Sequence, residues 1–309
     1  MNRNSIISMS LALGALTLAG CGGTGGGTGT PAAFPAGIYL LDTTTESVEF
    51  VSDMTGANWS EKPFGGNASA VAFAKDGSMI VVDQDNGRLA RMKSPNASSA
   101  EYFGTEGSGV HQFNIPKDVA VDSQGRIYVA DVNNLRIVRI DSFSGSGWTT
   151  MDTSGYSVGA YEPVNICIDA QDRIYAVFGV GGKVVRWDDM ADSQPEVYGP
   201  AGFFAQPNDI QVDAAGNIYV VDTGHYRVVR LPNMTGNGYT TLGSSGSGVG
   251  EFNEPSSLAI GPDGKIYIND VDNDRVVRVD DMTGAGWLEL PFNTVPGLLS
   301  GAPDDLVVR

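Results

Sequence analysis

The sequence predicts an all-β protein, a six-bladed β-propeller whose blades are four-stranded antiparallel sheets. Three observations support this fold class. A motif recurs along the chain at spacings of 44 to 48 residues, each copy alternates apolar and polar residues as strands do, and the two chain ends supply complementary parts of one blade. Repeats of this length are typical of solenoids and propellers, in which each unit buries its apolar faces against its neighbours.

The repeated motif is clearest at Pro116, where the chain reads PKDVAVDSQGRIYVADVNNLRIVRID. Copies that begin at Pro207 and Pro255 are close to it, and copies that begin at Pro163 and Ala68 are looser. Five copies in a fixed order predict five neighbouring structural units of the same kind.

Each copy contains the signals of four short strands. VAVD and RIYVAD alternate with a period of two, and a tight turn with Gly at a position of positive φ separates them. RIVRI predicts a third strand. A Gly-rich turn then leads to a fourth, which carries an aromatic residue, namely Trp148, Tyr239 or Trp287. Four strands per repeat correspond to one propeller blade.

The two ends of the chain complete the ring. The segment from Gly37 begins where the second strand of a blade should begin, and the final PDDLVVR matches an innermost strand with no blade after it. We therefore expect the C-terminal strand to join the N-terminal blade, which pairs strand edges that would otherwise be open. The propeller would span residues 37–309, with blades at about 37–65 plus 302–309, 66–112, 113–160, 161–204, 205–252 and 253–301.

The first 36 residues predict an export signal and a tether. Residues 1–20 combine Arg3 with an apolar run that is too short for a permanent membrane span. The following Cys21 completes Leu-Ala-Gly-Cys, which resembles a bacterial lipobox and implies a lipid on this cysteine; the alternative is an ordinary secreted protein. Residues 21–36 are rich in Gly, Thr and Pro and predict a flexible tether. We expect a lipid-anchored protein of the bacterial cell envelope, with outer membrane or cell surface preferred because Gly22 follows the cysteine.

The repeat resembles the NHL repeat. The resemblance covers about residues 37 to 309 and implies the propeller fold. It implies no single activity, because relatives include binding scaffolds and several kinds of enzyme. In the copy that begins at Pro116, the matching positions are Pro116, Asp122, Gly125, Tyr128, Asp131, Asn134 and Arg136.

The charge of the chain excludes some partners. Removal of residues 1–20 leaves 18 basic against 36 acidic residues, a net charge of −18. Such a ring repels nucleic acid and anionic lipid headgroups, so we expect neither nucleic acid as a partner nor contact with the membrane except through Cys21. Cys167 has no second thiol to pair with apart from Cys21, and a buried, inert thiol is expected. We expect a monomer.

Polar residues of three groups should converge on one face of the ring. One group precedes the innermost strands around the mouth of the central channel, a second lies on the loops between second and third strands, and His111 lies in a connection between blades. The first group is Asp118, Asn165, Asp209, Ser257 and Asp305. The second is Asp131, Asn133, Asp222, His225, Asp270, Asp272 and Asn273.

Two interpretations of these polar residues stay open. Asp131, Asp222 and Asp270 recur at one register with an Arg five residues later, a pattern that favours a framework contact within each blade. The first group could instead hold Ca²⁺, with Asn165, Asp209, Asp118 and Asp305 as the candidate ligands. Gluconolactonase-like propeller enzymes resemble this arrangement, but the sequence offers no axial Glu.

Two functions follow from these interpretations. The first is a lipid-anchored envelope scaffold or receptor that binds a protein, peptide or glycan on this face and catalyses no reaction. The alternative is a metal-dependent, Ca-type lactonase, hydrolase or lyase with its centre at the channel mouth.

Overall fold

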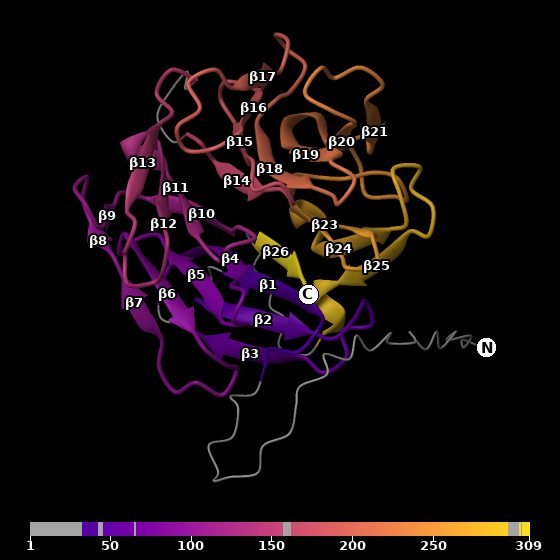
Figure 1. Ribbon diagram of the computed structural model, residues 1–309. Helices are drawn as coiled ribbons and strands as arrows, with labels where there is room; N and C mark the ends of the chain where they lie inside the picture. Colours follow the sequence, from indigo (N-terminus) through magenta and orange to yellow (C-terminus); the bar gives the residue numbers. More distant parts are fainter. Residues whose placement is uncertain (1–32, 43–45, 65, 157–161, 296–302, 304) are drawn as a thin grey trace, which may run out of the picture. The chain divides into compact units, whose positions relative to one another are not determined.

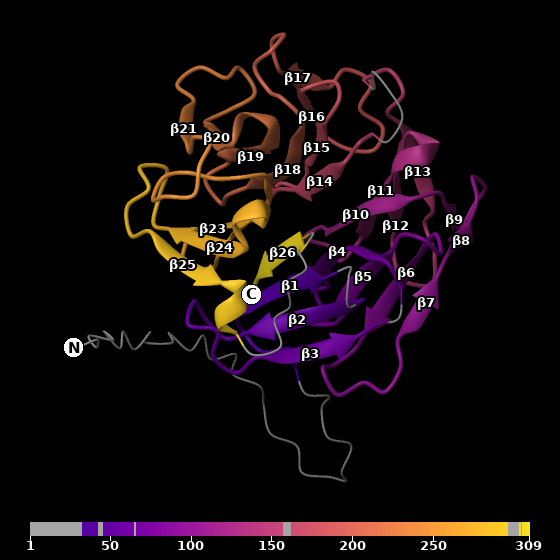
Figure 2. The same ribbon diagram turned by 180° about the vertical axis from the view of Figure 1, so that it is seen from behind.

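In the computed structural model of the protein, six four-stranded antiparallel sheets are arranged around a common axis (Figures 1 and 2). The structure describes residues 33–42, 46–64, 66–156, 162–295, 303 and 305–309. The predicted signal peptide, the lipidation site Cys21 and most of the tether lie outside these residues. Within the described part of the chain, no helix is long and apolar enough to cross a membrane.

The six blades share one strand order, from the channel outward. Blade 1 consists of β26 (Asp305–Val308), β1 (Ile38–Asp42), β2 (Ser47–Val51) and β3 (Ser60–Pro63), blade 2 of β4 (Ala68–Phe73), β5 (Met79–Asp83), β6 (Arg88–Met92) and β7 (Glu101–Phe103), and blade 3 of β10 (Pro116–Val121), β11 (Ile127–Asp131), β12 (Arg136–Ile140) and β13 (Thr149–Asp152). Blade 4 consists of β14 (Asn165–Ile168), β15 (Ile174–Phe178), β16 (Lys183–Trp187) and β17 (Glu196–Tyr198), blade 5 of β18 (Pro207–Val212), β19 (Ile218–Asp222), β20 (Arg227–Leu231) and β21 (Thr240–Leu242), and blade 6 of β22 (Pro255–Ile260), β23 (Ile266–Asp270), β24 (Arg275–Val279) and β25 (Leu288–Pro291).

Short elements complete the chain. A parallel pair of two-residue strands lies between blades 2 and 3, and one-turn 3₁₀ helices follow the second strands of blades 3, 5 and 6 and the last strand of blade 6. These elements are β8 (Thr105–Glu106), β9 (Gln112–Phe113), η1 (Val132–Asn134), η2 (Thr223–His225), η3 (Val271–Asn273) and η4 (Phe292–Thr294).

The predicted closure of the ring is confirmed. β26 pairs antiparallel with β1, with Ile38 opposite Val308 and Leu41 opposite Asp305. The backbone groups of Gly37 and Arg309 exchange two hydrogen bonds of 3.0 Å. The last residues of the chain therefore lie in the same sheet as the first strand (Figure 1).

The alternation within the strands explains how each blade packs on both neighbours. In β11, Val129 belongs to the apolar cluster between blades 2 and 3, whereas Ala130 belongs to the cluster between blades 3 and 4. Both are fully buried, because successive side chains of a strand point to opposite faces of the sheet. Each inner strand thus contributes to two interfaces, and the core is distributed around the ring.

The turns and aromatic residues have local causes. Gly125 has φ +84° in the tight turn between β10 and β11, where its N–H donates to the carbonyl of Asp122. Trp148 and Trp287 directly precede the fourth strands instead of lying within them, which corrects the expected position by one residue. Trp148 packs 5.4 Å from the ring of Phe113, in the interface between blades 2 and 3. Trp148 therefore contributes to the packing between two blades.

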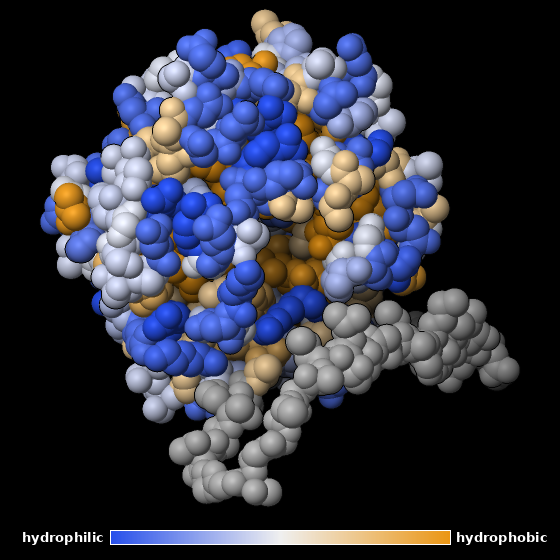
Figure 3. Space-filling view, viewed as in Figure 1, coloured by the Kyte–Doolittle hydropathy of each residue, from blue (hydrophilic) through white to orange (hydrophobic). Residues whose placement is uncertain are grey.

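Cys167 lies on β14 and is 7% exposed. Burial raises the pKa of its thiol to about 12, so the thiol stays protonated and unreactive. In the space-filling view, hydrophilic residues cover the outer loops and hydrophobic residues are visible in the hollow at the centre of the ring (Figure 3).

Candidate functional site

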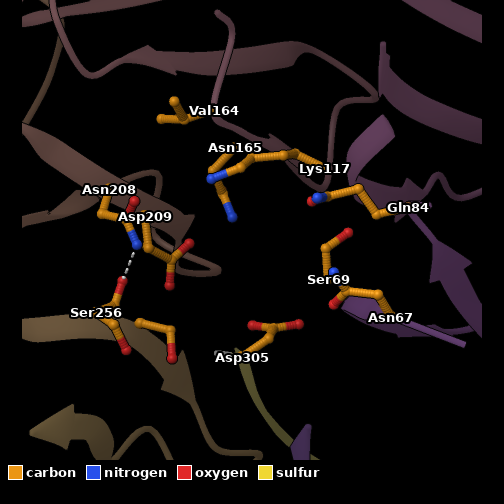
Figure 4. A pocket seen from close by; sticks show the side chains of 11 residues that line it. Asn67, Ser69, Gln84, Lys117, Val164, Asn165, Asn208, Asp209, Ser256 and Asp305 are labelled. Atoms are coloured by element: carbon orange, nitrogen blue, oxygen red, sulfur yellow. Dashed lines mark hydrogen bonds between the residues drawn. The ribbon is translucent and has the colours of Figure 1, made fainter. Parts of the chain in front are cut away.

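The innermost strands of all six blades contribute to one polar pocket at the mouth of the channel (Figure 4). The first residues of these strands lie beside the last residues of the second strands, as the pairing of Pro116 with Asp131 shows. The pocket has a volume of about 310 Å³. Its lining residues are Asn67, Ser69, Gln84, Lys117, Val164, Asn165, Asn208, Asp209, Ser256, Ser257 and Asp305.

Three aspartates of alternate blades hold the innermost strands together. Asp118 of blade 3 accepts the N–H of Val119 in its own strand and the N–H of Ile166 in blade 4, both at 2.7 Å. Equivalent pairs of bonds join Asp209 of blade 5 to blade 6 and Asp305 of blade 1 to blade 2. Their donors are Ile210 at 2.6 Å and Leu258 at 2.6 Å for Asp209, and Leu306 at 2.8 Å and Val71 at 3.0 Å for Asp305.

The intervening blades carry neutral residues at the same register. These are Ala70, Asn165 and Ser257 in blades 2, 4 and 6. Asn165 accepts the N–H of Ile210 at 3.3 Å through Oδ1. The hydroxyl of Ser257 is buried and has no hydrogen-bond partner. The inner ring therefore alternates between carboxylates that bridge blades and positions that are free or weakly bonded.

Burial and mutual repulsion perturb the inner carboxylates. Burial, followed by the charge of Asp305, raises the pKa of Asp118 to about 7 despite its two N–H donors. The same two causes raise the pKa of Asp209 well above its ordinary value. At neutral pH the ring is therefore only partly ionised, and the three carboxylates interact across the channel.

One ammonium group lies among these acids. Lys117 of blade 3 lines the pocket. Among the Lys and Arg residues that the structure describes, it alone has no hydrogen bond, ion pair or aromatic contact. The neighbouring polar groups are bonded within the fold: Ser69 donates to the carbonyl of Pro116 at 3.2 Å, and Asn208 donates to the carbonyl of Ser256 at 2.8 Å.

The outer aspartates form Asp–Arg ion pairs within their own blades, as the five-residue Asp–Arg spacing predicts. We call this repeated set of ion pairs the ladder. Asp131 is fully buried, accepts the N–H of Asn114 at 2.7 Å and pairs with Nε of Arg136 at 2.6 Å. Blades 5 and 6 repeat both contacts, and blade 2 repeats the ion pair. These pairs are Asp222–Arg227 at 2.8 Å, Asp270–Arg275 at 2.8 Å and Asp83–Arg88 at 2.6 Å.

This ladder runs through the segments that match a known repeat. The NHL repeat profile matches residues 113–140 and 204–231, which span the inner strands and the Asp–Arg pairs of blades 3 and 5. The chain contains NHL repeats. Human NHL repeat-containing protein 3 is 39% identical over 82 residues, which cover 26% of this chain and 23% of that protein. The match therefore spans about a quarter of the length of this curated relative.

Solved structures share the propeller fold at low sequence identity. A chain in the crystal structure of a nidogen/laminin complex has a TM-score of 0.68 at 16% identity, and the match covers 88% of this chain and 98% of that chain. A protein of unknown function from Bacteroides caccae has a TM-score of 0.66 at 13% identity, with coverage of 89% and 100%. Virginiamycin B lyase from Staphylococcus aureus, in a catalytically inactive form with quinupristin, has a TM-score of 0.61 at 12% identity, with coverage of 85% and 86%. These similarities establish the fold alone.

The NHL framework also accounts for the remaining outer candidates. Asn273 donates to Asp270 at 2.8 Å, His225 lies 2.9 Å from Asp222, and Asn133 donates to Asn114 at 3.2 Å. His111 packs between the rings of Phe103 and Trp148. None of the outer candidates, His111 included, lines the pocket at the channel mouth. Their positions are those of loop and blade contacts.

The oxygen atoms at the mouth are not arranged as the ligands of a calcium site. Of the four candidate ligands, Asn165, Asp209 and Asp305 line the pocket, whereas Asp118 does not. Each carboxylate oxygen of Asp209 and Asp305 already accepts a backbone N–H, while Ca²⁺ requires six to eight oxygen ligands. Within the described ranges, no group of three or more His, Cys, Asp or Glu side chains is placed to hold a metal ion. The calcium prediction therefore gains no support from the arrangement of these residues.

Several lining residues of the NHL propeller were missed at the level of sequence. The register of the first strand pair shifts between Pro116 and Asp118, and again at the equivalent positions of blades 5 and 6. The extra residue at each shift is Lys117, Asn208 or Ser256, and each lines the pocket. A β-bulge of this kind re-aims a side chain. The signal that could have revealed these residues is the repeated polar position directly before the inner ring.

Proposed function

We propose that this NHL propeller is a lipid-anchored binding protein of the bacterial cell envelope, which captures a peptide or glycan, free or as part of a larger protein, in the pocket at its channel mouth. One observation carries the proposal. The pocket gathers side chains from all six blades, and its free groups are hydrogen-bond donors that the fold does not use. A concave site with a few convergent polar groups is the usual form of a small-ligand site.

The roles of the carboxylates support binding without reaction. A metal-dependent hydrolase or lyase would use Asp209 and Asp305, yet both bridge neighbouring blades through two backbone N–H donors each. A catalytic acid or base must be free to reach the reacting atom. We therefore assign these carboxylates no catalytic role and keep the enzyme as the alternative that the experiment must exclude.

The location rests on the N-terminal segment. An apolar run that ends in Leu-Ala-Gly-Cys supports export and lipidation at Cys21, and the Gly-rich segment after it supports a mobile tether. Metabolic labelling of the expressed full chain with a radioactive fatty acid tests this part. Label that is present in the wild type and lost in Cys21→Ala supports the anchor, and equal label in both contradicts it.

The binding function is tested by filling the mouth. Gln84 lines the pocket without a side-chain hydrogen bond, so Gln84→Trp obstructs the mouth with little cost to the fold. Ser60 lies exposed on the outermost strand of blade 1, and Ser60→Trp is the matched control. The full chain is screened against a pentapeptide library and a glycan array. We expect ligands that bind the wild type and the Ser60→Trp variant alike and bind the Gln84→Trp variant at least tenfold more weakly.

The same screen separates binding from catalysis. Each ligand found is incubated with the protein, with and without added Ca²⁺, and its mass is measured. An unchanged mass supports the binding protein, and conversion that depends on Ca²⁺ would favour the enzyme. No ligand in either library, or ligands that Gln84→Trp does not affect, would contradict a site at the mouth.

A further inference from the structure

The chemistry of the mouth pocket indicates which kind of ligand it takes. We propose that it binds a small zwitterion of the amino acid or short peptide class, with the carboxylate on Lys117 and the ammonium group at Asp209 and Asp305. This inference rests on the proposed function, because it specifies the ligand of the same pocket.

Lys117 is the first reason. The mature chain has twice as many acidic as basic residues, and the other described Lys and Arg side chains all contact a partner. Arg91 and Lys93, for example, share the carboxylate of Glu101 at 2.5 Å. An ammonium group that stays unpaired in such an acidic protein, and that lines a pocket, is available for a ligand anion.

Two neutral hydrogen-bond donors of the pocket, Ser257 and Asn165, are also available to a ligand. Ser257 is 3% exposed, lines the pocket and has no hydrogen-bond partner for its hydroxyl. A buried polar group without a partner destabilises the fold, so a native protein tends to keep one only where a ligand or water completes the hydrogen bond. Asn165 accepts the backbone N–H of Ile210 through Oδ1, and its amide N–H groups donate to no described residue. In Figure 4 this amide nitrogen points into the middle of the pocket.

The opposite side of the pocket is acidic. Asp305 lies across the pocket from Lys117 and Asn165, and Asp209 lies on its flank (Figure 4). Each oxygen of the Asp209 carboxylate accepts one backbone N–H and retains a second lone pair that can accept another donor. The repulsion that Asp305 exerts on Asp118 and Asp209 would be relieved by a ligand cation at this side.

A zwitterion fits this charge pattern better than a simple ion. The acidic protein repels a ligand that carries only a carboxylate, and Lys117 repels a ligand that carries only an ammonium group. A zwitterion has no net charge and finds a partner for both of its groups. The pocket volume of about 310 Å³ equals the share of roughly ten water molecules in the liquid, which is room for a dipeptide.

The test uses three probes of similar size and different charge. Glycylglycine is a zwitterion, N-acetylglycine carries only the carboxylate, and glycinamide carries only the ammonium group. Binding of each probe to the full chain is measured by NMR titration. The variants are Lys117→Met, which removes the unpaired ammonium, and Lys93→Met, which removes an ammonium on the outer surface of blade 2.

We expect glycylglycine to bind the wild type more tightly than either singly charged probe. Lys117→Met should weaken glycylglycine at least tenfold and strengthen glycinamide, because the repulsive charge is gone, whereas Lys93→Met should change neither. A purely structural role of Lys117 would not produce opposite changes for the two probes. Equal binding of N-acetylglycine and glycylglycine, tightest binding of glycinamide, or an unchanged Lys117→Met variant would overturn the inference.

The outcomes also separate this inference from the proposed function. If the Gln84→Trp variant loses library ligands while glycylglycine does not bind the wild type, the mouth is a binding site for another class and the zwitterion inference is wrong. If neither the libraries nor the three probes contain a ligand that Gln84→Trp affects, both statements are wrong.

Discussion

Replacement of Asp118 by Ala tests whether the inner carboxylates bind neighbouring blades together. The substitution removes the acceptor of two backbone N–H groups, those of Val119 and Ile166, which are otherwise satisfied at 2.7 Å in a buried environment. A buried donor left without a partner costs about 1–3 kcal/mol. The loss is partly offset only above about pH 7, where the wild type buries an ionised Asp118 next to the charge of Asp305. We expect a net loss of about 2–4 kcal/mol in the free energy of unfolding at pH 5.

The free energy of unfolding of this variant should also depend less on pH than that of the wild type. The folded protein holds the pKa of Asp118 at about 7, above the ordinary value of 3.8 that the unfolded chain retains, so the folded state binds the extra proton between these values. The contribution of Asp118 to the free energy of unfolding is therefore fully present below about pH 4. It is lost as the pH rises toward 7, by at most about 4 kcal/mol. Wild-type stability should fall between pH 5 and pH 8, and the Asp118→Ala variant should show a smaller fall.

Urea unfolding at pH 5 and pH 8, followed by tryptophan fluorescence, measures both effects. Ser144→Ala, on an exposed loop of the same blade, is the control and should leave stability within about 0.5 kcal/mol. An Asp118→Ala variant as stable as the wild type at pH 5, or with the same pH dependence, would refute the bridging role.

Three further perturbations address the framework. Arg136→Met leaves the fully buried carboxylate of Asp131 without its cation and should cost roughly 3 kcal/mol in urea unfolding; an unchanged midpoint would contradict the ladder. Gly216→Ala should cost only about 1–2 kcal/mol, because φ is +83° while no atom lies within 4 Å of the added Cβ; a neutral or stabilising effect in the same assay would contradict a backbone origin. Deletion of residues 303–309 removes β26 and exposes the edge of β1, so we expect loss of the cooperative transition and aggregation in size-exclusion chromatography; a monomer with wild-type stability would contradict closure of the ring.

The architecture could be predicted from sequence because the information is redundant. The blades repeat the same alternation, four of them repeat the same turn at Gly77, Gly125, Gly216 or Gly264, and blade 4 has Asp172 in its place. The segment after Pro303 repeats the start of the motif without a blade to follow it. A single weak copy, such as the one at Pro163, is then identified by its neighbours. The ring and its closure follow from this register alone.

The lining of the site could be predicted only in part. Asn165 and Asp209, near the start of innermost strands, line the pocket at the mouth, whereas Asp118 at the same register of blade 3 does not. Lys117 lies at a shift in strand register between Pro116 and Asp118. The alternation of apolar and polar residues does not predict such a shift, so the position of Lys117 at the pocket could not be predicted. The sequence does not show which acidic residues bridge two blades, as Asp209 does, and which pair with an Arg of their own blade, as Asp222 does. This difference depends on burial and on the hydrogen-bond donors that surround each carboxylate in the folded protein.

A crystal structure of the full chain grown with glycylglycine would show whether the channel mouth binds a small zwitterion between Lys117 and the carboxylates of Asp209 and Asp305. We expect density for the dipeptide in the pocket, with its carboxylate on Lys117 and its ammonium group at Asp305. Ordered water alone, or a metal ion held by Asn165 and Asp209, would contradict it.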